Sequence, residues 1–146
     1  GMRADLRGVH IEFTSNLESP VLIQGIEDRL AQAFRNLLDN AISFSPDSGR
    51  ITVTLDNCDG IAQIIIEDEG PGLPQEDIDG VFERFYSERP ANEKFGDHSG
   101  LGLSIAKQIL EAHGGTIVAS NRAPRAGGKT SVSGARFLVQ IPVAMQ

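Results

Sequence analysis

Two asparagines on a predicted helix carry side chains suited to binding a metal ion together with phosphates. Apolar residues recur at helical spacing over Glu27–Phe44, and Asn36 and Asn40 lie one turn apart at the edge of that stripe. Two amide oxygens on one face can ligate a Mg²⁺ that also holds phosphates. A polar helix flank would carry the same residues, although asparagine is unfavourable inside helices. Ser43 is expected on the same face as both asparagines.

An acidic turn follows the apolar strand predicted over Ile61–Asp68, in the stretch DEGPG. The carboxylate of Asp68 can accept a hydrogen bond from an adenine amino group. Gly70 and Gly72 would let the chain turn tightly around the base. An ordinary acidic β-turn is the alternative interpretation.

The stretch FERFY carries three aromatic residues and an arginine ahead of a long polar segment, Ser87–Gly100. Phe82 and Phe85 could anchor a lid formed by that segment, and Arg84 could reach a phosphate. An amphipathic turn that packs on the core would have a similar composition.

Glycines precede a second helix, predicted over Leu101–His113, and also follow it. A helix start offers unpaired N–H groups and the positive end of a dipole, and nearby glycines let an anion approach. Gly96, Gly100 and Gly102 would serve a phosphate in this way, and Gly114-Gly115 would form a left-handed C-cap. Taken alone, the glycines are more typical of plain turns.

The remaining pattern indicates a two-layer α/β sandwich. An Asp59-Gly60 turn predicts a hairpin, and Asp77–Phe85 has the pattern of a short helix. We therefore expect a mixed five-stranded sheet with about three helices on one face. The predicted strands are Val9–Phe13, Ile51–Leu55, Ile61–Asp68, Thr116–Ser120 and Ala135–Pro142.

Length and composition favour a single domain over residues 1–146. A formal net charge of −7 argues against a nucleic-acid surface, but not against a nucleotide site. Cys58 stands alone, which excludes an intrachain disulfide, and no apolar run reaches the length of a membrane span. Gly1 before Met2 has the form of a tag-cleavage scar, so we expect a fragment of a larger protein.

The motifs NLLDNA, DEGPGL, FERFY and GLGLSIAKQILEAHGG, in this order and spacing, resemble the catalytic ATP-binding domain of sensor histidine kinases. That domain shares a Bergerat-type fold with gyrase, Hsp90 and MutL. The resemblance covers about Arg7 to Val143, and the four motifs match the N, G1, F and G2 boxes. The stretch from Phe82 to Ile109 is also similar to sensor kinases of the ChvG/ExoS type.

The resemblance implies Mg²⁺ and ATP as cofactors, with a lid between the F and G2 boxes. Asn40 would ligate Mg²⁺, Asn36 would assist near the phosphates, and Asp68 would bind the adenine amino group. The implied nucleotide-binding set is Asn36, Asn40, Ser43, Asp68, Gly70, Gly72, Leu73, Phe82, Arg84, Phe85, Gly96, Gly100, Leu101, Gly102 and Leu103.

The resemblance also implies transfer of the γ-phosphoryl group to a histidine. Related ATPases carry a glutamate where this chain has Asn36, and an amide cannot act as a general base for water. The histidines here are His10 on a strand, His98 in the expected lid, and His113 near a helix C-terminus, where a cation is favourable. None lies in the family's phosphoacceptor setting, so we expect the acceptor on a separate dimerisation domain.

The implied partners are that dimerisation domain and, indirectly, a response regulator, without nucleic acid. We expect a monomeric fragment of a homodimeric kinase, on the cytoplasmic side of a membrane-anchored sensor. Ser43 and Ser87 replace basic residues common in the family, and Ala135 replaces a threonine. A nucleotide-binding or docking module with weak transfer therefore stays open, as does a serine kinase of the anti-sigma-factor type; a hydrolytic ATPase ranks last because of Asn36.

Overall fold

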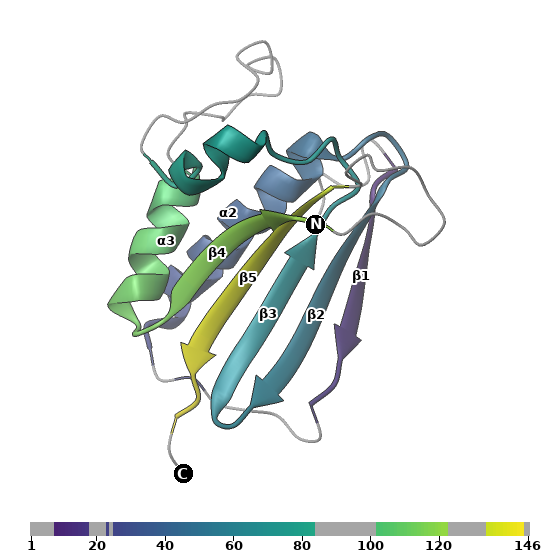
Figure 1. Cartoon of the computed structure of the whole chain (residues 1–146). Coiled ribbons are helices and arrows are strands. Elements are labelled where there is room, and N and C mark those ends of the chain that lie inside the picture. The colour runs from purple at the N-terminus through teal and green to yellow at the C-terminus, as the bar shows by residue number, and fades with distance from the viewer. Residues whose placement is uncertain (1–7, 18–22, 24, 84–101, 123–133, 145–146) are drawn as a thin grey trace.

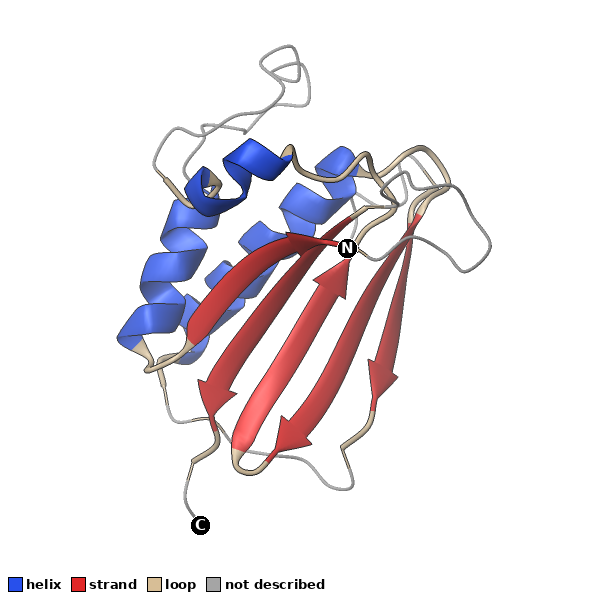
Figure 2. Cartoon of the chain, in the orientation of Figure 1, coloured by secondary structure: helices blue, strands red, loops and turns tan. Residues whose placement is uncertain are grey.

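A five-stranded mixed sheet forms one layer of the molecule, and two α-helices cover one of its faces (Figures 1 and 2). The structure is a computed structural model that describes residues 8–17, 23, 25–83, 102–122 and 134–144. The strand order is β1-β2-β3-β5-β4, with β1 parallel to β2 and the other neighbours antiparallel. The strands are β1 His10–Ser15, β2 Arg50–Cys58, β3 Ile61–Glu67, β4 Thr116–Asn121 and β5 Ala135–Pro142. The expected two-layer α/β sandwich is confirmed.

The helices form where the apolar period of the sequence places them. Helix α2 spans Glu27–Phe44, as predicted, and α3 spans Gly102–Ala112, one residue shorter at each end than expected. A 3₁₀ helix, η1, covers Gln75–Gly80. The helix predicted over Asp77–Phe85 therefore begins two residues earlier than expected. It starts directly after Pro74, whose φ of −56° is already close to that of a helix. The described part of the chain thus has two α-helices and one 3₁₀ helix.

The core lies between the helices and the inner face of the sheet. The apolar stripe of α2 packs there with that of α3, against alternate residues of the strands. Completely or almost completely buried members are Ala33, Leu37, Ala41, Ile51, Ile66, Ala106, Leu110, Phe137, Val139 and Ile141. Each large side chain among them contributes about 1.5–3 kcal/mol through burial.

Turn chemistry also follows the sequence. Asp59 and Gly60 both have positive φ, 55° and 83°, as the tight turn of the β2–β3 hairpin requires. Gly114 has a φ of 80°, and the N–H of Gly115 donates to the carbonyl of Leu110, which closes the end of α3. The predicted hairpin and left-handed helix cap are therefore confirmed.

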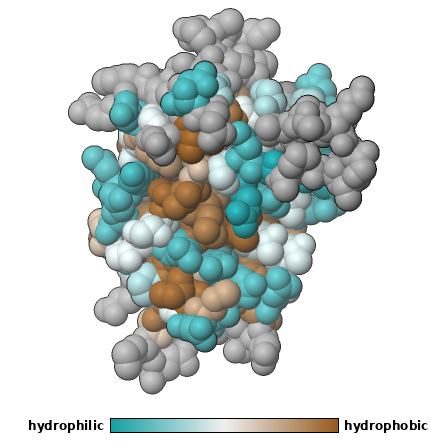
Figure 3. All heavy atoms as spheres, in the orientation of Figure 1, coloured by the Kyte–Doolittle hydropathy of each residue, from teal (hydrophilic) through white to brown (hydrophobic). Residues whose placement is uncertain are grey.

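The outer face of the sheet carries a short apolar row. Ile65 pairs with Leu138, which pairs with Val118, and the three residues cross neighbouring strands β3, β5 and β4. Figure 3 shows apolar side chains in the middle of this face with polar groups around them. Among the helices of the described residues, none is long and apolar enough to cross a bilayer.

Candidate nucleotide-binding site

Asn36 joins the middle of α2 to the beginning of α3. Its Nδ2 donates to the carbonyl oxygen of Gly102, at 3.2 Å. A Cβ added to Gly102 would lie 4.0 Å from the Cβ of Asn36, so the two helices meet closely here. Asn40 and Ser43 follow on the same helix and are half-buried. The predicted amide pair therefore lies on the helix that packs against the glycine-initiated helix.

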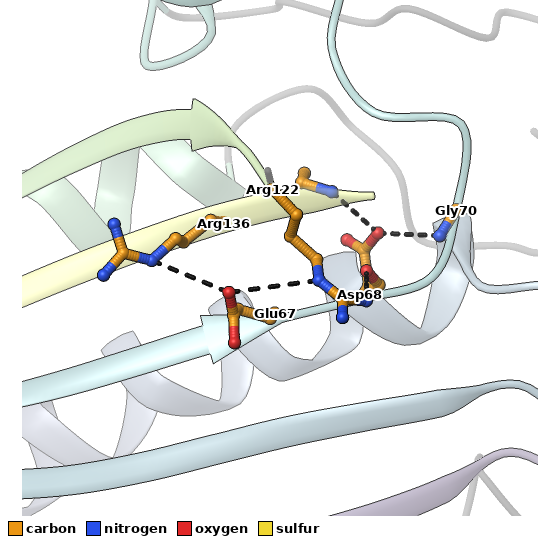
Figure 4. A network of polar contacts seen from close by, with 6 residues as sticks. Glu67, Asp68, Gly70, Arg122 and Arg136 are labelled. Carbon is orange, nitrogen blue, oxygen red and sulfur yellow. Dashed lines mark hydrogen bonds and ion pairs between the residues drawn. The ribbon is translucent and has the colours of Figure 1, made fainter. Parts of the chain in front are cut away.

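Asp68 lies immediately beyond β3 and is 2% exposed. Its Oδ1 accepts hydrogen bonds from the N–H of Gly70 at 2.9 Å and the N–H of Ala135 at 3.1 Å (Figure 4). The N–H of Asp68 donates to the carbonyl of Ala135 at 3.1 Å. Asp68 is therefore a buried carboxylate that two backbone N–H groups hold at the end of β3.

Two glycines permit the backbone contacts around Asp68. A Cβ at Gly134, whose φ is 134°, would collide with the carbonyl oxygen of Asp68. A Cβ at Gly70 would collide with the carbonyl oxygen of Phe44, the last residue of α2. The acidic turn therefore packs directly on the C-terminal end of the helix that carries Asn36 and Asn40.

A charged network surrounds Asp68 that sequence reasoning did not find. Arg122 donates from Nη1 to the carbonyl oxygen of Asp68 at 3.0 Å. The carboxylate of Glu67 lies 3.9 Å from Nε of Arg122 and 3.6 Å from Nε of Arg136, as Figure 4 shows. Glu67 of β3 pairs with Arg136 of β5, so the two side chains lie on one face of the sheet. This cross-strand pair of opposite charges is the feature from which the network could have been predicted.

Leu73, the last residue of the DEGPGL motif, is held by an asparagine that was also missed. The N–H of Leu73 donates to Oδ1 of Asn121 at 2.7 Å, and Nδ2 of Asn121 donates to the Leu73 carbonyl at 2.9 Å. Leu73 is 8% exposed. Gly72 before it has a φ of 83°. No local pattern links residues 48 apart in sequence, so this contact required the fold.

Phe82 packs on the core, in contact with β5 through Phe137 and with α3 through Lys107. Its ring meets that of Phe137 edge to face, with centroids 6.0 Å apart and planes at 79°. Nζ of Lys107 lies 5.3 Å from the centroid of the Phe82 ring. Phe82 is thus well anchored, as a residue at the base of a lid should be; its role in a lid stays a prediction.

Five predicted site residues lie outside the described residues. They are Arg84, Phe85, Gly96, Gly100 and Leu101. His98, Ser87 and the segment expected to form the lid lie outside them as well. Gly102 and Leu103 are described, and they open α3.

The two described histidines have different surroundings. His10 on β1 is exposed. His113 approaches the carbonyl oxygen of Ile109 with Nδ1, at 2.7 Å, and its Nε2 accepts the N–H of Ile26, at 3.0 Å. The imidazole therefore links the end of α3 to the residue before α2.

The described residues contain no cluster of three or more His, Cys, Asp or Glu side chains that could hold a metal ion. An apolar hollow of about 360 Å³ lies between α2 and strands β1 to β3. Phe34, Leu38 and Leu55 are among its lining residues, and none of the predicted site residues is. The hollow is therefore distinct from the candidate nucleotide site.

Comparison with known proteins identifies the family. A family model described as histidine kinase-, DNA gyrase B- and HSP90-like ATPase matches residues 25–145. Sensor protein ChvG of Rhizobium meliloti (strain 1021) is 46% identical over 133 residues, which cover 90% of this chain and 22% of that protein. ChvG of Agrobacterium fabrum is 49% identical over 124 residues, covering 84% and 20%. The chain thus spans about a fifth of the length of these curated relatives.

The fold agrees with that assignment. A solved structure of a mycobacterial sensor histidine kinase, MprB, matches with a TM-score of 0.81 and 33% identity, over 99% of this chain and 89% of that one. The similarity to ChvG confirms the subtype suggested by the stretch from Phe82 to Ile109. The chain therefore belongs to the histidine kinase-, DNA gyrase B- and HSP90-like ATPase family, as a catalytic domain of the sensor histidine kinase type.

Proposed function

We propose that the domain binds Mg-ATP along one side of α2, with the base at Asp68 and the phosphates towards the start of α3. It then donates the γ-phosphoryl group to a histidine of a dimerisation domain in the same kinase. The observation that carries this proposal is the position of α2, which contacts the start of α3 at Asn36 and the acidic turn at Phe44. Eight residues of helix separate these contacts, or about 12 Å.

The base end of the site suits adenine. Asp68 is buried and anchored by two N–H groups on Oδ1, so its carboxylate has a fixed position. Adenine presents an amino donor where guanine presents a carbonyl oxygen. A fixed carboxylate would accept a hydrogen bond from the amino group of adenine and repel the carbonyl oxygen of guanine.

The phosphate end depends on α3. A helix begins at Gly102 with backbone N–H groups that lack intrahelical acceptors, and the helix dipole favours an anion there. Asn36 contacts this residue and carries no charge that would repel a phosphate. These features support a position for the phosphates between the start of α3 and the polar edge of α2.

Asn40 would hold Mg²⁺ through its amide oxygen, while phosphate oxygens and water supply other ligands. Mg²⁺ prefers oxygen ligands and is commonly bound by one or two protein groups together with phosphates. Asn40 fits this requirement because it is half-buried, one turn from Asn36, on a helix that contacts both ends of the site. When bound, the ion would offset phosphate charge.

Phosphoryl transfer fits the residues better than hydrolysis does. An amide at position 36 cannot take a proton from water, whereas an imidazole is already a nucleophile. In the transfer, a bond forms between an acceptor imidazole nitrogen and the γ-phosphorus, and the bond from that phosphorus to the bridging oxygen breaks. ADP leaves with that oxygen.

The test is calorimetric titration of the purified chain with ATP, with and without Mg²⁺, followed by transfer to an added acceptor domain. Saturable Mg²⁺-dependent binding and acid-labile phosphate on the acceptor are expected. Acid-stable phosphate on serine would instead favour the serine-kinase alternative. Binding without transfer would favour a nucleotide-binding or docking module, which Ser43 in place of a basic residue makes plausible.

A further inference from the structure

The end of β4 contacts both ends of the turn that carries the proposed base-binding residue. Arg122 donates to the carbonyl oxygen of Asp68 at 3.0 Å, at the beginning of the turn. Asn121 exchanges two hydrogen bonds with the backbone of Leu73, at 2.7 and 2.9 Å, at its end. The last residue of β4 and the residue after it therefore span the Asp68–Leu73 turn.

The contact between Asn121 and Leu73 has the form of a β-bridge made by a side chain. Its amide oxygen accepts the N–H of Leu73 and its amide nitrogen donates to the carbonyl of the same residue. Among uncharged side chains of this length, an amide supplies a donor and an acceptor side by side in this way. Because Gly70 and Gly72 make the turn intrinsically flexible, an outside restraint is needed to give it one conformation.

Arg122 is itself held in place. Its main-chain N–H donates to the carbonyl oxygen of Gly134 at 2.8 Å, and its side-chain Nε lies 3.9 Å from Oε2 of Glu67. Glu67 also pairs with Arg136, at 3.6 Å. The side chains of Arg122 and Glu67 are 25% and 28% exposed, so the pair orients the guanidinium more than it stabilises the fold.

We infer that Asn121, assisted by Arg122, is a positioning residue for recognition of the nucleobase. Asn121 fixes the Leu73 end of the turn and Arg122 fixes the Asp68 end, so together they determine where the Asp68 carboxylate meets the base. The inference rests on the proposed role of Asp68. It adds that discrimination between adenine and guanine depends on an asparagine beyond the turn.

The experiment measures dissociation constants of the purified chain for ATP and GTP, with the melting temperature of every variant. The variants are Asn121→Ala, Asn121→Ser and Asp68→Asn. Asn57→Ala is the matched control, since Asn57 is exposed and next to last in β2. The β2–β3 hairpin lies at the opposite end of β3 from the turn that follows it (Figure 1). The serine hydroxyl is shorter than the amide and can bond at most one of the two Leu73 groups, which makes Asn121→Ser the milder variant.

For Asn121→Ala we expect ATP to bind roughly 5–20-fold more weakly and GTP to change less than about twofold, the loss typical of one or two hydrogen bonds. The preference for ATP, given by the dissociation constant for GTP divided by that for ATP, should fall by a similar factor. Asn121→Ser should give an intermediate ratio, and Asn57→Ala should leave it unchanged. A variant that is merely unstable weakens the binding of both nucleotides by the same factor. The preference for ATP over GTP therefore distinguishes a positioning role from a loss of folding.

The inference is overturned if Asn121→Ala leaves this preference for ATP unchanged while Asp68→Asn lowers it. If Asn121→Ala does not fold, Asn121→Ser serves as the test. A preference for ATP over GTP equal to that of the parent chain then overturns the inference. If the parent chain and Asp68→Asn have the same ratio, the proposed role of Asp68 is wrong, and the inference falls with it.

Discussion

Asn36 of α2 and Gly102 of α3 are joined by a hydrogen bond across 66 residues of sequence, from the side-chain Nδ2 to the main-chain carbonyl oxygen at 3.2 Å. The bond orients the Asn36 amide at the beginning of α3. Because that end of the helix carries the proposed phosphate site, the bond couples the predicted catalytic asparagine to the segment that would bind the triphosphate. We therefore expect ATP binding to depend on both the neutrality and the orientation of this side chain.

Asn36→Asp should weaken ATP binding more than Asn36→Ala does, although aspartate is nearly isosteric. A carboxylate oxygen would face the Gly102 carbonyl oxygen and lie near the proposed phosphates, adding two repulsions. We expect the dissociation constant for ATP to rise at least about tenfold, corresponding to about 1.4 kcal/mol. Titration with adenosine is the control, because a ligand without phosphates should lose little. Equal losses for ATP and adenosine would place the phosphates elsewhere.

Asn40→Ala should weaken binding of Mg-ATP and leave binding of metal-free ATP nearly unchanged. The amide oxygen is the proposed protein ligand of Mg²⁺, so its removal matters when the ion is present. Calorimetry with Mg²⁺ and with a chelator measures both constants, and the coupling between the mutation and the ion is their difference. Zero coupling would reject Asn40 as a magnesium ligand.

Two substitutions of Asp68 should separate binding from folding. Asp68→Asn keeps an acceptor for the N–H groups of Gly70 and Ala135, so its melting temperature should stay near that of the parent. It should nevertheless weaken the binding of ATP and reduce the preference for ATP over GTP. The reason is that an amide N–H donor can then face the base, where the carboxylate offered only acceptors. Asp68→Ala leaves two buried N–H groups without an acceptor, at a cost of about 1–3 kcal/mol each. Thermal melting and nucleotide titration of both variants test this, and equal stability would contradict it.

The sequence predicts local features of this fold well and long-range contacts poorly. The bounds of α2 follow from an apolar stripe over 18 residues, and the Asp59-Gly60 turn follows from two residues that tolerate positive φ. Asn36, Asn40 and Asp68 are predicted as site residues because each stands beside a recognisable pattern, either a helix edge or a strand end.

Asn121 and Arg122 had no such pattern. Their partners, Leu73 and Asp68, lie 48 and 54 residues away, and only the antiparallel pairing of β4, β5 and β3 brings them together. The role of His113 also depends on tertiary structure, because its position near the end of a helix does not predict its contact with the N–H of Ile26, 87 residues away.

Gly134→Ala should destabilise the domain strongly. An added Cβ would collide with the carbonyl oxygen of Asp68 in a backbone conformation that already disfavours side chains. We expect a loss of more than about 2 kcal/mol in the free energy of unfolding, measured by denaturant titration. Gly60→Ala is the control, since Gly60 also has positive φ but meets no atom within 4 Å. Similar losses in the two variants would mean that backbone strain, and not the close approach to Asp68, sets the requirement.

His113→Ala should lower stability with little effect on nucleotide affinity. The imidazole links the end of α3 to the residue before α2, through Ile109 and Ile26, and a Cβ at Gly25 would collide with the ring. Loss of two hydrogen bonds should cost about 1–2 kcal/mol. His10→Ala is the control, because His10 is exposed on β1. Differential scanning calorimetry should give a lower melting temperature for His113→Ala alone, and ATP titration below that temperature should match the parent. A large loss of ATP affinity in a folded His113→Ala would show instead that this end of α3 governs the phosphate site at its beginning.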